Sequence, residues 1–281
     1  MNTLKVWLLM GVMTVLLVLM GNAIGGNSGA LMFFLIAMVM NFIGYFYSDK
    51  ISIKMTRSYP VSEKEAPELY EIVGRLSQRA GIPMPRLYVT PSDQPNAFAT
   101  GRNPANAAVA VTEGIMRLLN RSEVEGVLAH ELAHIKNRDV LVGTIAAALA
   151  GAISMIGNVI QWGAIFGMGR SDDDEGGPGL IGGLAMAIVF PIAAMIIQLA
   201  ISRSREYGAD ETGARIAGSS DGLANALLKM ETAAHRIPMK VSPATSHLFI
   251  VNPFSGASMV RLFSTHPPIQ ERVERLRRIK V

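Results

Sequence analysis

The 281-residue chain contains no cysteine. This absence excludes disulfide bonds and any metal site built from thiolates, and it agrees with soluble parts that face the reducing cytoplasm. The chain also lacks a glycine-rich phosphate-binding loop, so nucleotide-driven work on another protein is not encoded in it. Any chemistry must therefore come from ligands and bases other than cysteine, without coupled nucleotide hydrolysis.

Charged residues are scarce. They make up 17% of the chain, half of the residues are hydrophobic, and the mean hydropathy is +0.32. Stretches that are nearly free of charge and long enough to cross a bilayer predict four transmembrane helices: Val6 to Ile24, Leu31 to Tyr47, Val140 to Met168 and Leu180 to Ile201. Polar residues and a proline interrupt the third and fourth stretches, so buried or partly inserted helices remain an alternative for these two.

Positive charge is almost absent from one side of this predicted topology. Of the 26 Lys and Arg residues, all but Arg170 lie in segments that would share a side with Lys5 and Lys50. The positive-inside rule places that side in the cytoplasm, together with both termini. The acidic, glycine-containing loop 169–179 suits the opposite side. A cleavable signal peptide is the alternative for the first stretch, but its length favours an uncleaved anchor in a multi-pass membrane protein.

The pentapeptide His130-Glu131-Leu132-Ala133-His134 carries the strongest chemical signal. Histidines four positions apart project from one face of a helix and can occupy two corners of a zinc tetrahedron. Glu131 can then reach a water on the metal and accept its proton. The motif predicts a zinc hydrolase. The alternative is a buried helix whose histidines are simply hydrogen-bonded.

The residues around the pentapeptide predict the helix that carries it. Ser122 and Glu125 have the spacing of a capping box and precede apolar residues at helical intervals. The predicted helix therefore runs from about Ser122 through at least Asn137.

A third protein ligand is needed, and the residues after His134 have no Gly or His at the metzincin spacing. Glu206 on a second helix can supply the ligand instead. Asp210 lies one turn later and can accept a hydrogen bond from a ligand histidine, for which His130 is the expected partner. Acidic residues on a solvated helix face are the alternative for both.

These positions predict the domain organisation. Residues 1–50 would form two transmembrane helices, residues 51–139 and 202–281 a cytoplasmic zinc protease domain, and residues 140–201 a transmembrane hairpin between the metal ligands. The motif helix would run directly into the third stretch. The metal would then lie near the cytoplasmic membrane surface, and packing of the membrane helices would set the separation of its ligands.

The soluble segments predict an α+β fold that is mostly helical and carries a small β-sheet. Alternation predicts strands at Arg86 to Thr90, Asn96 to Thr100 and Ala107 to Thr112, the last with the small residues of a sheet edge to which a substrate backbone could add. Capping signals and apolar periodicity predict helices from Pro67 to Gly81, from Asp221 to Ala234 and from Pro268 to Ile279.

The C-terminal region offers two further features. His266, just before a Pro-Pro pair, could donate a hydrogen bond to an oxyanion at the metal, and a structural role is its alternative. A basic cluster is expected to face water or anionic lipid head groups: Arg272, Arg275, Arg277, Arg278 and Lys280. No further motif supports nucleic-acid binding, so no nucleic-acid partner is predicted.

Together, the HELAH pentapeptide, the segment SRSREYGAD at 202–210, NAFA at 96–99 and THPP at 265–268 resemble the bacterial and archaeal HtpX heat-shock proteases over nearly the whole chain. The resemblance implies a gluzincin-type zinc endopeptidase of the cell inner membrane that degrades damaged or misfolded membrane proteins under stress. It implies one Zn²⁺ held by His130, His134 and Glu206, catalysis by Glu131, and a substrate-cleft role around Asn96.

Two alternatives to this function remain. One is a processing protease of the related CAAX-prenyl type, although four transmembrane helices are few for an enclosed membrane chamber. The other is a non-catalytic membrane module that binds metal or assists assembly, although structural zinc sites are usually closed by four protein ligands. Because the chain has no nucleotide site, substrates would have to arrive unfolded or be presented by a partner. Whether the protein forms a homo-oligomer is left open by the sequence.

Overall fold

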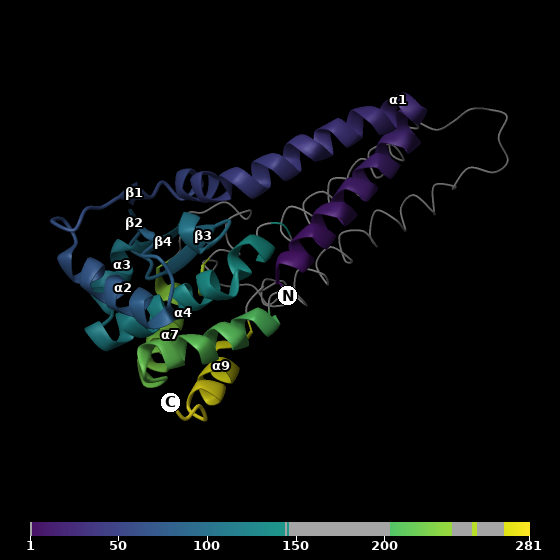
Figure 1. Ribbon diagram of the computed structural model, residues 1–281. Helices are drawn as coiled ribbons and strands as arrows, with labels where there is room; N and C mark the ends of the chain where they lie inside the picture. The colour runs from purple at the N-terminus through teal and green to yellow at the C-terminus, as the bar shows by residue number, and fades with distance from the viewer. Residues whose placement is uncertain (1, 144, 146–202, 238–248, 252–266) are drawn as a thin grey trace.

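A long helical segment, α1 (Asn2–Met55), begins the computed structural model, which describes residues 2–143, 145, 203–237, 249–251 and 267–281. The backbone leaves helical geometry at Gly25 and Gly26, so α1 folds back on itself as two limbs that lie side by side (Figure 1). The limbs, Leu4–Asn22 and Gly25–Met55, are apolar and long enough to cross a membrane. They match the first two predicted stretches, whereas nearly all of the third and fourth lies outside the described residues.

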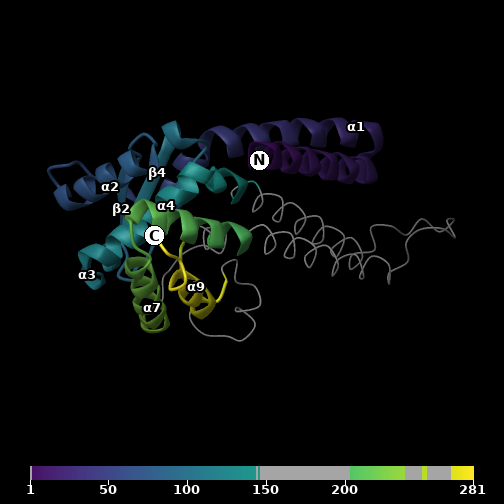
Figure 2. The ribbon, with the colours of Figure 1, turned by 60° about the horizontal axis from the view of Figure 1, so that its bottom comes forward.

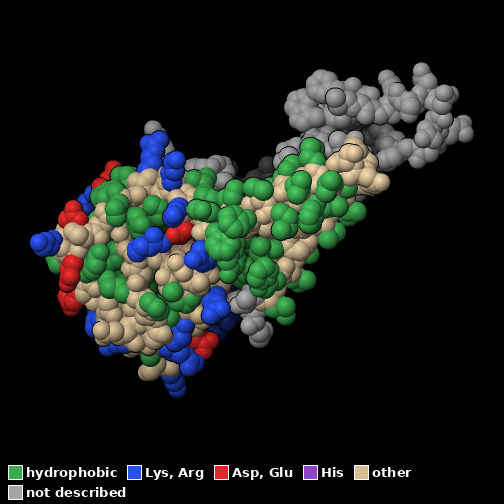
Figure 3. Space-filling model, turned by 45° about the horizontal axis from the view of Figure 1, so that its top comes forward, with side chains coloured by type: hydrophobic (Ala, Val, Ile, Leu, Met, Phe, Trp, Pro, Cys, Tyr) green, Lys and Arg blue, Asp and Glu red, His purple; other side chains and the backbone are tan. Residues whose placement is uncertain are grey.

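The limbs share an apolar cluster that includes Met13, Leu17 and Ala37, and they make close contacts at specific positions. Gly21 and Gly29 lie so close that a Cβ added to either would meet the backbone of the other. The Asn41 amide donates to Thr14 Oγ1 at 2.9 Å. Large hydrophobic side chains on the outside are exposed, for example Leu8 at 67%. This apolar hairpin, called the arm below, projects from a rounded body, called the domain (Figure 3).

The sheet of the domain has the strand order β1-β2-β4-β3. Its strands are β1 (Tyr59–Pro60), β2 (Arg86–Thr90), β3 (Ala97–Gly101) and β4 (Ala107–Thr112). Strands β2 and β4 are parallel, and the other two pairs are antiparallel. The predicted strands are thus present, with β3 shifted by one residue. The prediction that Ala107 to Thr112 forms a sheet edge is wrong, because β4 is a central strand and β3 is at the edge.

Small residues allow β4 to be covered on both faces. Val109 and Val111 face the main hydrophobic core, which also contains side chains of α2 (Pro67–Ala80) and α4 (Arg121–Asn137). On the opposite face, Ala110 packs with Phe98 of β3 and with Phe249. All six residues of β4 are buried. The sheet is therefore a middle layer, and the short elements η1 (Pro104–Asn106) and α3 (Glu113–Leu118) flank β4 in the chain.

The beginning of α4 differs from the prediction. Asn120, not Ser122, is the N-cap: its side chain accepts from the Glu123 amide, and the Glu123 carboxylate accepts from the Asn120 amide, both at 3.0 Å. The capping box predicted at Ser122 and Glu125 is therefore wrong by two residues. Asparagine is as good an N-cap as serine, so the sequence offered two competing starts.

The end of α4 is at Asn137 as predicted, but the helix does not run directly into the third apolar stretch. Arg138 adopts a left-handed conformation with φ of 58°, and its amide closes the helix by bonding the His134 and Ile135 carbonyls. A new helical segment starts at Asp139. The two helices are thus joined by a turn.

The described part of the domain contains three further helical segments: residues 203–217, α7 (Asp221–Arg236) and α9 (Ile269–Leu276). Figure 2 shows α7 and α9 beneath α4. Glycines allow the close approach, because a Cβ on Gly126 of α4 would meet the backbone of Leu223, and one on Gly213 would lie 2.9 Å from the backbone of His130. The 203–217 helix is therefore held directly against the motif. The described fold is mostly helical with one small mixed sheet.

Candidate metal site

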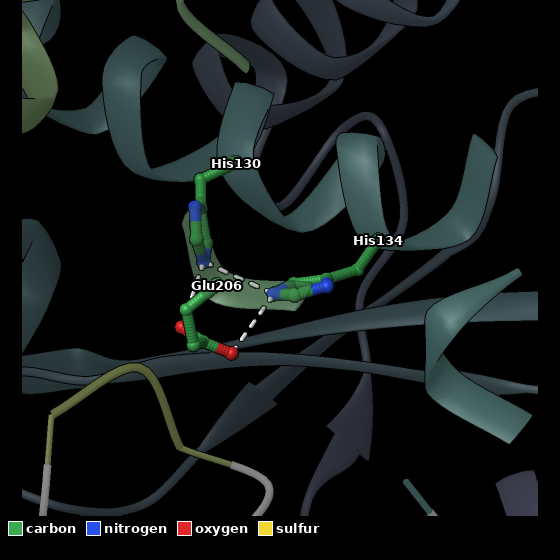
Figure 4. A group of neighbouring side chains, drawn as sticks. All are labelled: His130, His134 and Glu206. Atoms are coloured by element: carbon green, nitrogen blue, oxygen red, sulfur yellow. Dashed lines mark hydrogen bonds and ion pairs between the residues drawn. The ribbon is translucent and has the colours of Figure 1, made fainter. Parts of the chain in front are cut away.

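Two helices bring three potential metal ligands together (Figure 4). Helix α4 presents His130 and His134 on one face, and the 203–217 helix presents Glu206 opposite them. The two Nε2 atoms are 3.1 Å apart, and the Glu206 oxygens lie 3.6 Å from His130 Nε2 and 3.4 Å from His134 Nε2. Residues more than 70 positions apart in the chain thus converge on one point.

The three separations fit a zinc ion. Ligand atoms about 2.0–2.1 Å from zinc at tetrahedral corners are about 3.3–3.4 Å apart, and the observed separations of 3.1 to 3.6 Å bracket that value. Within the described residues, this trio is the group identified as able to hold a metal. Two imidazoles and a carboxylate are also a ligand set that zinc accepts.

The balance of charge around this point favours a divalent cation. Four carboxylates are buried near it: those of Glu131, Asp139, Glu206 and Asp210. Among the described residues, the buried guanidinium groups of Arg205 and Arg272 interact with these carboxylates. Buried carboxylates gain stability from nearby positive charge, and a Zn²⁺ ion between the ligands would supply more of it.

Each histidine has a carboxylate beside its other ring nitrogen. Asp210 Oδ1 lies 3.0 Å from His130 Nδ1, and Asp139 Oδ2 lies 3.4 Å from His134 Nδ1. Such partners fix the tautomer and the orientation of a ligand imidazole. Asp210 was the partner expected for His130, whereas sequence reasoning missed Asp139, although it lies only five residues after His134.

These partners also shift the pKa values of the side chains. Burial disfavours the charged form of His134, but hydrogen bonds with Asp139 and Glu206 outweigh burial and raise its pKa to about 10. The pKa of His130 is raised too, because Asp210 and Glu206 outweigh its burial. Burial would raise the pKa of Asp210, yet the Arg272 charge prevails and lowers it to about 2. The site therefore has a strong attraction for positive charge.

Glu131 occupies the position that the motif assigns to a general base. It is 3% exposed and lies between the two histidines in sequence. Its charge acts on His134 and on Arg272, so the carboxylate is near both. It is therefore available at the metal site without belonging to the group of three ligands.

Arg272 of α9 is the residue that sequence reasoning misplaced. It was expected to face water or lipid, but it is 0% exposed and donates to both Asp210 oxygens, from Nε at 3.0 Å and from Nη2 at 2.7 Å. Its Nη1 lies 3.5 Å from Glu206. The sequence does contain a pattern that predicts the burial of Arg272. The buried face of a helix has a spacing of three and four residues, which is the spacing of Ile269, Arg272, Val273 and Leu276. Exposure is observed for Arg275, Arg277, Arg278 and Lys280.

Asn96 lies at the start of β3 and is fully buried. Its side chain donates to the Val251 carbonyl at 2.8 Å and accepts from the Val251 amide at 3.3 Å, while the Ile250 amide donates to the Ala97 carbonyl. Asn96 thus holds residues 249–251 along the outer edge of β3. His266, the other candidate contact for a substrate, lies outside the described residues.

An HExxH helix, a mixed sheet packed above it and a glutamate from a second helix are the arrangement of a zinc-type metallopeptidase. Comparison with protein families agrees with this class. The chain belongs to peptidase family M48, whose family model matches residues 63–280.

Relatives are similar over almost the whole length. The chain is 71% identical to the "Protease HtpX homolog" of Pelotomaculum thermopropionicum, with 98% of each chain covered. It is 55% identical to the "Protease HtpX homolog" of Thermococcus kodakarensis, covering 98% of this chain and 95% of the relative. The resemblance to HtpX proteases that the motifs indicated is therefore confirmed.

A solved structure supports the fold. The crystal structure of S. mikatae Ste24p superposes with a TM-score of 0.57 at 19% identity, covering 95% of this chain and 62% of that chain. At this identity the likeness concerns the fold alone. Together with the two apolar helices of the arm, family membership identifies the chain as a membrane-associated protease of a metallopeptidase family.

Proposed function

We propose that this protein is a zinc-dependent membrane endopeptidase that hydrolyses peptide bonds of misfolded or damaged membrane proteins, as part of protein quality control under stress. One Zn²⁺ would be held by His130, His134 and Glu206. The observation that carries the proposal is the separation of 3.1 to 3.6 Å among their ligand atoms. The printed name of the relatives, "Protease HtpX homolog", supports the proteolytic activity.

The mechanism assigns separate tasks to the surrounding residues. Zinc at such a site supplies Lewis acidity, which makes water a nucleophile near neutral pH. Glu131 accepts a proton from the attacking water and passes it to the departing amine. Asp210 and Asp139 hold the imidazoles through their Nδ1 atoms. Arg272 holds Asp210 from two sides and so acts as a positioning residue.

We further propose the membrane topology that the charge distribution favours. Residues 140–201 form a second membrane hairpin, which gives four transmembrane helices in the inner membrane. Residues 51–139 and 202–281 form the catalytic domain, with the active site and both termini in the cytoplasm. The two limbs of the arm support the first two of these four transmembrane helices, because both limbs are apolar and long enough to cross a membrane.

The decisive experiment compares the wild type with Glu131→Gln in detergent, with zinc measured by mass spectrometry and proteolysis by cleavage of casein. We expect about one zinc per chain in both proteins and cleavage by the wild type alone, because the amide cannot accept the proton. Cleavage by Glu131→Gln would refute the assignment of the base. Metal in both with cleavage in neither would favour a narrow-specificity processing protease or a binding module.

The ligand assignment has its own test. His134→Ala and Glu206→Ala should each lose zinc as well as activity, because a site with two protein ligands binds the ion weakly. Glu211→Ala is the matched control, because Glu211 is an exposed carboxylate on the same helix as Glu206 and pairs with Arg215. It should keep both metal and activity. Normal zinc content in His134→Ala or Glu206→Ala would remove that residue from the ligand set.

A further inference from the structure

A cleft of about 350 Å³ separates the base of the arm from the domain. One wall comes from both limbs of the arm, with Trp7 and Tyr45. The other wall comes from Arg102 and Arg138 of the domain and from Leu141 of the helical segment that follows Arg138. The arm–domain cleft lies beside the C-terminal end of α4, because Arg138 is the residue that closes that helix. The metal site does not use any of these side chains.

The cleft lies at the depth where lipid head groups are expected. A bilayer core is about 30 Å thick and takes about 20 helical residues to cross. Counted from the turn at Gly25, the second limb completes that distance near Tyr45. Trp7, at the start of the first limb, stacks on Tyr45 with ring centroids 6.0 Å apart. Tryptophan and tyrosine at such a level mark a membrane–water interface.

The charge of the cleft is positive. Among the described residues that line it, two are arginines and none is a carboxylate. Arg102 also lines a neighbouring cavity of about 310 Å³, which contains the Asp49 carboxylate that accepts from Arg86 at 2.6 Å. The guanidinium of Arg102 lies 5.1 Å above the ring of Phe46, which lines the neighbouring cavity, so Arg102 lies between the two cavities. Two arginines at an apolar boundary are suited to the planar recognition of phosphate oxygens.

We propose that the arm–domain cleft binds an anionic phospholipid, with its phosphate between Arg102 and Arg138 and its acyl chains along the arm. A soluble phosphate ester shares the charged group. The lipid is favoured because Trp7, Tyr45 and Leu141 form apolar walls that continue into the exposed hydrophobic surface of the arm (Figure 3). Such a ligand would join the arm to the domain at the end of the motif helix.

The fluorescence of Trp7 provides a test that does not depend on proteolysis. The chain has two tryptophans, Trp7 and Trp162, so a Trp162→Phe background isolates the signal from the cleft. The full-length protein is placed in phosphatidylcholine vesicles that contain a small fraction of lipid brominated near the carbonyl end of its acyl chains. Bromine quenches tryptophan on contact, so stronger quenching by brominated phosphatidylglycerol than by brominated phosphatidylcholine measures preference for the anionic lipid.

Three variants sharpen the test. Arg102→Gln/Arg138→Gln should lose about 10-fold or more in relative affinity per arginine removed, because each guanidinium would donate hydrogen bonds to the charged phosphate, which contribute more than an exposed surface charge does. Arg102→Lys/Arg138→Lys should keep most of the preference. Lys5→Gln/Lys54→Gln removes the same charge from exposed residues of α1 that do not line the cleft, and it should leave the preference unchanged. Circular dichroism and zinc content serve as controls for folding.

Equal quenching by the two lipids in the wild type would overturn the proposal. So would an equal loss of preference in the glutamine double variants of the arginines and of the lysines, because this would indicate a general surface potential. Displacement of the brominated lipid by soluble glycerol phosphate would also overturn it, in favour of a site for free phosphate esters. Preference that is lost only with Arg102 and Arg138, and is insensitive to glycerol phosphate, would establish the lipid site.

Discussion

The arm and the domain place charged and hydrophobic side chains in opposite ways. On the arm, large apolar residues such as Leu8 and Leu19 are at least 60% exposed, and the described contact between its limbs is partly polar, through Asn41 and Thr14. In the domain the hydrophobic residues are buried, and a network of ionised groups lies at the centre. Removing one polar or charged partner should therefore cost much more in the domain than in the arm. In the domain the remaining charge is left buried away from water, whereas in the arm a hydrogen bond between helices that lipid surrounds contributes little.

The largest effect is expected from Arg272→Met in the domain. The substitution leaves Asp210 without the two hydrogen bonds that Arg272 donates, in a buried site. Breaking one partner of a buried ion pair costs about 3–5 kcal/mol. Thermal unfolding of the chelated protein should show this loss of stability, and added zinc should restore part of it by supplying positive charge.

Arg275→Met on the same helix is the matched control. Arg275 is exposed, and its guanidinium lies 4.0 Å above the Tyr207 ring. Loss of such a cation–π contact costs about 0.5–1 kcal/mol at an exposed site. Equal destabilisation by both variants would show that the burial of the Arg272 charge has no special importance.

A smaller loss is expected from Gly213→Ala, which tests the close packing behind the metal site. The added methyl group would lie 2.9 Å from the His130 backbone, so the 203–217 helix must shift and move Glu206 away from the histidines. Overpacking of this kind costs about 1–3 kcal/mol. Zinc affinity, measured by competition with a chelator, should fall together with stability.

Gly208 lies on the same helix, and among the described residues no atom outside the neighbouring backbone of that helix lies within 4 Å of the position that its Cβ would take. Gly208→Ala should therefore keep the zinc affinity of the wild type and gain up to about 1 kcal/mol from helix propensity. Weakened zinc binding in both alanine variants would contradict the packing argument.

The smallest effect is expected from Asn41→Leu in the arm. The substitution removes the hydrogen bond to Thr14, and interhelical hydrogen bonds in membranes contribute on average about 0.6 kcal/mol. Unfolding of the protein in mixed micelles should change by no more than about 1.7 kcal/mol, the upper end of such measurements. A loss as large as that of Arg272→Met would mean that the arm depends on polar contacts as strongly as the domain does.

Local patterns in the sequence predicted much of the fold. The bounds of β2 and β4 follow from alternation and turn residues, α2 begins at Pro67 and is closed by Gly81, and the limbs of the arm follow from hydropathy. Local spacing predicts that His130 and His134 share one helix face and that Glu206 and Asp210 share another, and in the structure the two pairs lie against each other. Helical geometry determines which residues share a face within one or two turns, so the sequence is sufficient to predict each pair on its own helix.

Other features depend on contacts between distant segments. The small residues of β4 suit an edge strand and also a strand covered on both faces, and only the packing of Phe249 and α1 decides between them. Arg272 stands in a basic run that resembles a solvated surface, and its burial depends on Asp210, 62 residues earlier. The bond between Asn96 and Val251 joins residues 155 positions apart. No local spacing carries this information.

The turn at Arg138 has a mechanical consequence. A single residue in the left-handed conformation ends α4 before the next helix starts at Asp139, so the direction of α4 is not transmitted along a continuous rod. The orientation of the motif is instead determined by the sheet, by α7 and by the 203–217 helix, which contact α4 directly. In the proposed topology, a change in the tilt of the segment after Asp139 would be absorbed at this joint, and His130, His134 and Glu206 would keep their separation.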